Sequence, residues 1–169
     1  MRPRHTLDDA RRAREFEAYV AGAGGRLLHT ATLLTAEPRG DNPRARRLLT
    51  LALARTYASW DRLHGEDPYD HTRQYLATRF ARGAWHQNGG LLRSRSRSRP
   101  AGPLAGLTPQ ERLVLVIRLY EGVDGEQTAA LLGLPVERVR TVFNRAMANV
   151  LRPAPRPAPP VGGVEAVPS

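Results

Sequence analysis

The segment GEQTAALLGLPVERVRTVFNRA, residues 125–146, concentrates side chains that could recognise a nucleic acid. On a helix that begins near Val136, the 3.6-residue period places four apolar side chains on one side: Val136, Val139, Val142 and Phe143. The opposite side then carries Glu137, Arg138, Arg140, Thr141, Asn144 and Arg145. Arginine reads guanine edges or grips phosphates, asparagine reads adenine, and threonine commonly holds a phosphate. The pattern predicts a DNA-reading face, and an ordinary solvated helix face is the alternative interpretation.

The spacing within the same segment is typical of a helix-turn-helix. Such a motif needs a small residue in its first helix, a glycine at the turn where the backbone is left-handed, and branched apolar anchors in its second helix. Ala129 supplies the small residue, Gly133 follows four positions later, and Val139 lies six positions beyond it. The hydrophobic seam is completed by Leu132, Leu134 and Val142.

The preceding stretch LTPQERLVLVIRLYEGVDG predicts a supporting helix. Thr108 and Pro109 form a favourable start, and Glu111 stands three residues after Thr108 as a capping-box partner. The expected core stripe of this helix is Leu113, Val116, Ile117 and Tyr120.

Residues 14–88 are expected to be helical, in three helices. The first carries apolar residues at helical spacing from Phe16 to Leu34, although three glycines at 22, 24 and 25 weaken its middle. Asn42-Pro43 and Asp67-Pro68 each predict a helix start, with a cap followed by proline at the first helical position.

The amino-acid composition limits the classes of function that this chain can have. The formal net charge is +10 and every basic residue is arginine, which favours a polyanionic partner, although GC-rich coding also favours arginine. There is no cysteine, so thiolate metal sites and cysteine nucleophiles are excluded. The five histidines are scattered without metal-ligand spacing and the acidic residues show no catalytic pairing. We therefore expect no enzyme, no metal and no cofactor.

No run of about 18 apolar residues exists and the amino-terminal segment has no apolar signal core, so a cytoplasmic location is expected.

The chain divides into five segments. The predicted organisation is a flexible N-terminus (1–13), a helical module (14–88), a flexible Arg/Ser/Gly/Pro linker (89–106), a helix-turn-helix module (107–152) and a Pro-rich disordered tail (153–169). The fold class is all-α, with two small helical domains.

Residues 107–152 resemble region 4 of extracytoplasmic-function (ECF) sigma factors, which belong to the sigma-70 superfamily of bacterial transcription initiation factors. The stretches FEAYVAGAGGRLLHTATLLT and ALARTYASWDRLHGEDPYDHTRQYLATRFARGAW resemble region 2 of the same family. The resemblance implies that the chain binds core RNA polymerase and promoter DNA, with an anti-sigma factor as a further candidate partner. It implies no catalysis, because the polymerase performs the chemistry.

The resemblance also implies site residues. The recognition helix would contact the −35 element through Arg138, Arg140, Thr141, Asn144 and Arg145. The third helix would contact −10 DNA through Arg73, Arg79, Arg82, Trp85 and His86, since an aromatic ring near a basic helix end can stack on an unpaired base.

The second helix departs from the family pattern. Where relatives carry a stretch resembling AEDLVQE, this chain has ARRLLTL at residues 45–51. The candidate polymerase-binding residues are therefore Arg46, Arg47, Leu48 and Leu51. Two carboxylates have become guanidinium groups, and like charge at an interface can cost several kcal/mol. Polymerase binding by this helix is expected to be weak or unusual, or the helix has left that role.

Two other functions fit the same residues. The chain could be a sigma-like DNA-binding regulator that does not recruit polymerase, since LTPQER and the helices after it also resemble LuxR-type regulators. It could also be an interaction module that sequesters an anti-sigma factor. Polymerase-dependent initiation separates the first function from both alternatives.

Overall fold

The computed structural model describes residues 3–63, 65–87 and 104–152. Six α-helices follow one another: α1 (Pro3–Thr35), α2 (Pro43–Ser59), α3 (Pro68–Gln87), α4 (Pro109–Leu115), α5 (Gly125–Leu132) and α6 (Val136–Leu151). A 3₁₀ turn (Trp60–Arg62) follows α2, and a π-helical turn (Val116–Tyr120) continues α4. All regular secondary structure in the described part is helical, which confirms the predicted all-α class. Residues 89–103 of the expected linker, residue 88 before it and the tail 153–169 lie outside the described residues.

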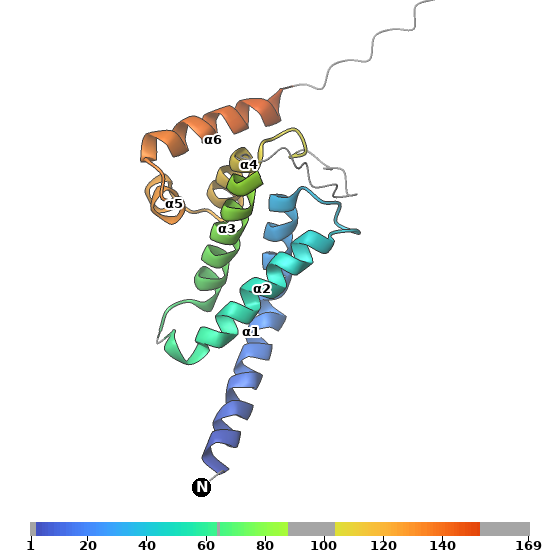
Figure 1. Cartoon of the computed structure of the whole chain (residues 1–169), viewed down its shortest axis with the longest axis vertical. Helices are drawn as coiled ribbons and strands as arrows, with labels where there is room; N and C mark the ends of the chain where they lie inside the picture. The colour runs from blue at the N-terminus through green and yellow to red at the C-terminus, as the bar shows by residue number, and fades with distance from the viewer. Residues whose placement is uncertain (1–2, 64, 88–103, 153–169) are drawn as a thin grey trace, which may run out of the picture.

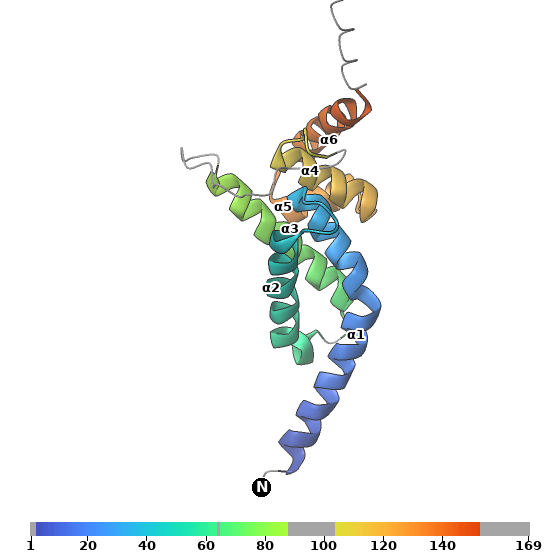
Figure 2. The ribbon, with the colours of Figure 1, turned by 90° about the vertical axis from the view of Figure 1, so that its right-hand side faces the viewer.

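The first module is built from α1, α2 and α3, which pack along one another (Figures 1 and 2). Its core consists of small and branched side chains: Leu27, Ala31, Ala45, Ala52 and Leu76. Buried hydroxyl groups link the three helices, because Thr72 bonds both Thr56 (2.8 Å) and Tyr19 (2.6 Å). These hydrogen bonds satisfy polar groups that would be costly to bury alone.

Helix α1 is longer and more regular than expected. It begins at Pro3, within the segment 1–13 that was expected to be flexible, and it continues through the three glycines without a break. Ion pairs support its first turns, since Arg12 contacts Asp9 (3.2 Å) on α1 and Asp61 (3.0 Å) on the 3₁₀ turn. Tertiary packing thus outweighs the weak helix propensity of glycine.

The expected cap of α2 is wrong. Pro43 is the first residue of α2 as predicted, but the Asn42 side chain makes no capping hydrogen bond and bonds Thr32 and Arg46 instead. The buried carboxylate of Glu37 takes this role by accepting hydrogen bonds from the backbone N–H groups of Arg44 (3.1 Å) and Ala45 (2.8 Å). A carboxylate there satisfies two orphan donors and complements the positive helix end.

The second module follows its sequence signals closely at the helix ends. Thr108 and Glu111 form the predicted capping box at α4. Asp124 caps α5 by accepting a hydrogen bond from the Gln127 N–H at 2.8 Å. Gly133 ends α5 with φ 64°, the left-handed backbone that the turn requires.

Two residues expected in the core of the second module are exposed. Val136 is 38% exposed because it is the first residue of α6, and the buried stripe starts one turn later at Val139. Tyr120 is exposed because the π-helical turn, closed by a hydrogen bond from the Glu121 N–H to the Val116 carbonyl, inserts an extra residue into that turn. The insertion rotates Tyr120 outward and turns Glu121 toward the first module.

The two modules pack directly against each other, which the sequence analysis did not predict. One apolar cluster combines Leu34, Ala77 and Ala81 of the first module with residues of the second, including Val114 and Ile117. Helix α4 lies beside both α1 and α3, and α5 also contacts α3. Figure 1 shows α6 crossing the end of the molecule above α4, away from the amino-terminal part of α1.

Candidate nucleic-acid interface

Helix α6 is anchored by one face and exposes the other. Val139, Val142 and Ala146 are fully buried against the rest of the second module. The six polar residues expected on the opposite side are all exposed: Glu137, Arg138, Arg140, Thr141, Asn144 and Arg145. The helix therefore presents one polar, mainly basic face of the size that a DNA major groove admits.

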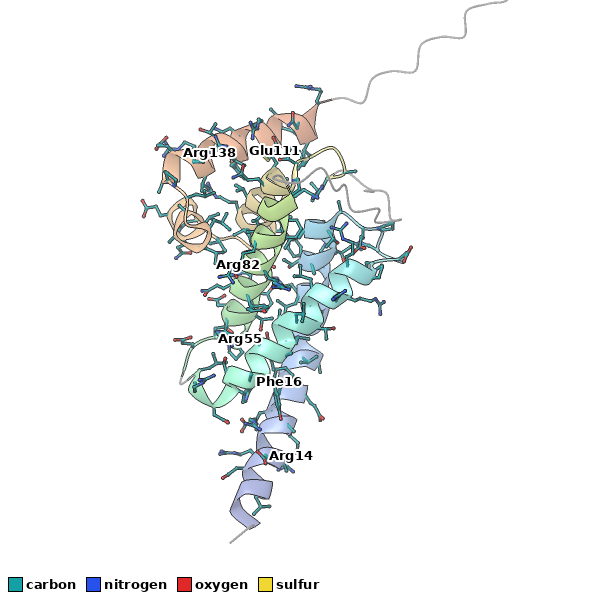
Figure 3. The ribbon with its side chains drawn as sticks, in the orientation of Figure 1. Arg14, Phe16, Arg55, Arg82, Glu111 and Arg138 are labelled. Atoms are coloured by element: carbon teal, nitrogen blue, oxygen red, sulfur yellow. The ribbon has the colours of Figure 1, made fainter. Side chains whose placement is uncertain are left out.

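Internal contacts divide this face into two groups. Arg140 pairs with Glu137 at 3.1 Å, and the Thr141 hydroxyl donates to the Glu137 carbonyl at 2.8 Å. Within the described residues, the side chains of Arg138 and Asn144 have no such partner, and Figure 3 shows Arg138 on the first part of α6. Arg138 and Asn144 are thus the side chains of this face most available to a ligand.

Glu111 of α4 fixes the middle of α6. Its buried carboxylate accepts hydrogen bonds from the Thr108 backbone N–H (2.9 Å) and from Arg145 Nε (2.7 Å). Burial alone would raise the pKa of Glu111, but the hydrogen bonds with Thr108 and the charge of Arg145 together lower it. Arg145 is therefore partly committed to holding α6 on α4, which its sequence position did not reveal.

The expected −10 residues separate into two groups on α3. Arg79 and Arg82 are exposed, and Figure 3 shows Arg82 on this helix. Arg73 is only 15% exposed and pairs with Asp70 (3.0 Å) and Glu121 (4.0 Å). Trp85 and His86 belong to α3, but their side chains lie outside the described residues. Arg73 thus faces the second module in this arrangement.

Glu121 is the main residue of the site that sequence reasoning missed. Its side chain is 0% exposed and accepts a hydrogen bond from the Tyr69 hydroxyl, shared between the two carboxylate oxygens at 3.0 and 2.9 Å, and one from the Thr30 hydroxyl. Arg26 adds an ion pair at 3.4 Å. Burial, followed by the negative charge of Glu121, raises the pKa of Tyr69, so the phenol stays a donor in alkaline solution as well as at neutral pH. The signal in the sequence that could have identified Glu121 is its position directly after the apolar run LVLVIRLY.

A second basic surface lies on α2. Arg46 and Arg47 are exposed, Leu51 is 39% exposed, and Leu48 is partly buried against the core of the first module. Arg55 extends the exposed basic surface toward the other end of the helix, as Figure 3 shows. No acidic residue occurs in α2, so this face carries only positive charge.

Comparison with known proteins gives a family for this arrangement. The family model "Sigma-70, region 4" matches residues 104–150, which contain α4, α5 and α6. The chain is 29% identical over 154 residues to the RNA polymerase sigma-E factor of Streptomyces coelicolor, covering 80% of this chain and 84% of that protein. The sigma-E factor of Streptomyces antibioticus is 28% identical over 152 residues, with 80% and 82% covered.

A helix-turn-helix module with an exposed basic recognition helix, joined to a second helical module, is typical of DNA-binding transcription factors. The region 4 match in the second module, and the similarity to sigma-E factors across both modules, narrow this class to sigma factors. Residues 104–150 match the sigma-70 region 4 family, and together with the similarity to sigma-E factors this supports a sigma-70 family factor of the extracytoplasmic-function group. The family consists of transcription initiation factors, as the resemblance in the sequence indicated.

The described part of the chain offers no support for two other kinds of site. No helix among the described residues is long and apolar enough to cross a membrane. No group of three or more possible metal-ligating side chains is found among them either.

The contacts of Glu121 predict that it stabilises the packing of the two modules. We expect Glu121→Ala to lower the free energy of unfolding by about 2–4 kcal/mol, because the hydroxyl groups of Thr30 and Tyr69 and the charge of Arg73 would lose their acceptor. Glu126→Ala, at an exposed position of α5, is the control and should change stability little. Urea denaturation of both variants makes the comparison, and equal stabilities would contradict the prediction.

Proposed function

We propose that this sigma factor directs core RNA polymerase to promoters by reading a −35 element with α6 and contacting the opened −10 element with α3. The observation that carries the proposal is the exposed polar face of α6, held in place by Glu111 and by the apolar stripe beneath it. A rigidly held helix can place several side chains on base edges at once, which is what sequence recognition requires.

The two groups of α6 side chains suit different tasks. Arg138 and Asn144 are free of internal contacts in the described part of the chain, so they are our candidates for reading bases. Arg140, Thr141 and Arg145 each have an internal partner that fixes their orientation, and we assign them to phosphates. In this assignment the phosphate contacts set the register and the base contacts set the preference.

The proposed −10 contacts come from α3. Arg79 and Arg82 are exposed and would attract the DNA backbone, while Trp85 and His86 would stack on unpaired bases. Arg73 is enclosed between the modules, so its use in DNA binding requires that the modules separate around Glu121. The −10 contacts of Arg73 are therefore proposed for the polymerase-bound form.

The polymerase itself would meet the α2 surface formed by Arg46, Arg47, Leu48 and Leu51. Leu51 offers apolar area for burial, and the two arginines give the surface its charge. We assign no chemistry of its own to the chain, since the polymerase forms the phosphodiester bonds. A cytoplasmic location and regulation by an anti-sigma factor belong to the same proposal.

Reconstituted transcription tests the function. Core polymerase with this chain should initiate from a promoter that the polymerase alone does not use. Arg138→Ala combined with Asn144→Ala should reduce initiation at least about thirtyfold, because the two base contacts together are worth about 2–6 kcal/mol. Arg14→Ala, an exposed arginine on α1, is the control for lost charge.

Specific DNA binding without polymerase-dependent initiation would contradict the proposal and favour a regulator that does not recruit polymerase. Binding of neither DNA nor polymerase, together with a co-purifying small protein, would favour the interaction module.

Reversing the charge of the α2 surface tests the polymerase contact. We expect Arg46→Glu with Arg47→Asp to tighten core-polymerase binding about tenfold, because the change restores the acidic pattern that the family uses there. The control is Arg14→Glu, which reverses an exposed charge on α1. Sedimentation or calorimetry with core polymerase measures the affinity, and an unchanged value would show that this surface serves another partner.

A further inference from the structure

We propose that a pocket at the junction of the two modules binds a phosphate-class anion. The pocket is an open hollow of about 180 Å³ that is lined by residues of both modules. Three of the lining residues are arginines from different helices: Arg44 of α2, Arg79 of α3 and Arg112 of α4. None of its lining residues is acidic. This proposal does not depend on which side chains of α6 contact DNA bases.

Arg112 provides the strongest evidence. It is only 7% exposed, and its Nε and Nη1 groups donate to the backbone carbonyls of Leu34 (3.0 Å) and Leu107 (2.9 Å). Both of these acceptors are neutral carbonyl oxygens, and no carboxylate forms an ion pair with Arg112 among the described residues. Buried charges are normally paired or neutralised, so a buried guanidinium held only by neutral acceptors leaves a positive site incompletely compensated.

The neighbouring charges add to this imbalance. Burial lowers the pKa of Arg112, and the positive charge of Arg44 lowers it further. The carboxylate of Glu37 does not line the pocket, and its two oxygens accept hydrogen bonds from the backbone N–H groups of Arg44 and Ala45. Because Glu37 already binds the amino-terminal N–H groups of α2, an anion in the pocket would bind the guanidinium groups of the arginine side chains.

The geometry favours phosphate over a single carboxylate. Guanidinium groups bind phosphate oxygens through paired, charge-assisted hydrogen bonds, and three groups from three helices can surround a tetrahedral dianion. The apolar residues Leu48 and Phe80 complete the wall and reduce the exposure of the bound charge to water. The ligand is either a free phosphate compound or a phosphate of a nucleic-acid backbone.

A bound anion would also hold the two modules together. Arg44 and Arg79 belong to the first module, whereas Arg112 belongs to the second. One phosphate group contacting all three would bridge the modules and add to the contact that Glu121 makes elsewhere along the junction. Occupancy of the pocket would therefore favour the packed arrangement over the separated one.

Calorimetric titration of the full chain with inorganic pyrophosphate tests the site, with circular dichroism to verify that each variant is folded. We expect saturable binding, weakened at least about tenfold by Arg44→Glu, which places a negative charge at the pocket. The control is Arg55→Glu, which makes the same charge reversal on α2 outside the pocket and should bind as the unchanged chain does. No saturable binding, or equal weakening in both variants, would overturn the proposal.

A second titration distinguishes the two sources of phosphate. If nucleic acid fills the pocket, Arg44→Glu should weaken binding of a random-sequence DNA duplex more than Arg55→Glu does, and pyrophosphate should compete with the duplex. If a free phosphate compound fills it, the two variants should bind the duplex equally while only Arg44→Glu loses pyrophosphate. Either pattern supports an anion site and identifies its occupant.

Discussion

The arrangement of this molecule depends on one buried carboxylate, that of Glu121. A charge removed from water must be compensated, and here the donors are supplied by the other module: the hydroxyl groups of Thr30 and Tyr69, with Arg26 and Arg73 at the edge. The contact fixes how α4 lies on α1 and α3. Since α6 is held on α4 through Glu111, the direction of the recognition helix follows from the same contact.

The π-helical turn explains how this carboxylate reaches the junction. An uninterrupted α-helix would have continued the buried stripe from Ile117 to Tyr120 and left the next residue outside. The inserted residue shifts the phase, so Tyr120 is exposed beside His29 while Glu121 is buried. A local change in helix type thus converts a solvent-facing glutamate into the polar centre of the contact between modules.

The starts of α2, α3 and α4, the turn at Gly133 and the exposed face of α6 could be predicted because they depend on neighbours in the sequence. The capping box of Thr108 and Glu111 and the left-handed Gly133 are examples, and so is the outward direction of Arg138. Arg112 bonded to the Leu34 carbonyl and Arg73 paired with Glu121 could not be predicted, because their partners come from distant segments. Glu37 as the cap of α2 could not be predicted either, because it reaches the helix end from seven residues upstream, beyond the usual cap position. Periodicity identifies the faces of a helix but does not indicate which other helix will cover them.

The central claim is that this chain gives polymerase its promoter preference through two separate DNA contacts, one on α6 and one on α3. Selection of bound sequences from a random DNA pool by the reconstituted holoenzyme, followed by sequencing, tests it most directly. The account predicts two short enriched elements at a fixed spacing, with Asn144→Ala changing the preference at positions of the upstream element alone. Enrichment of a single element, or the same enrichment by the chain without polymerase, would contradict it.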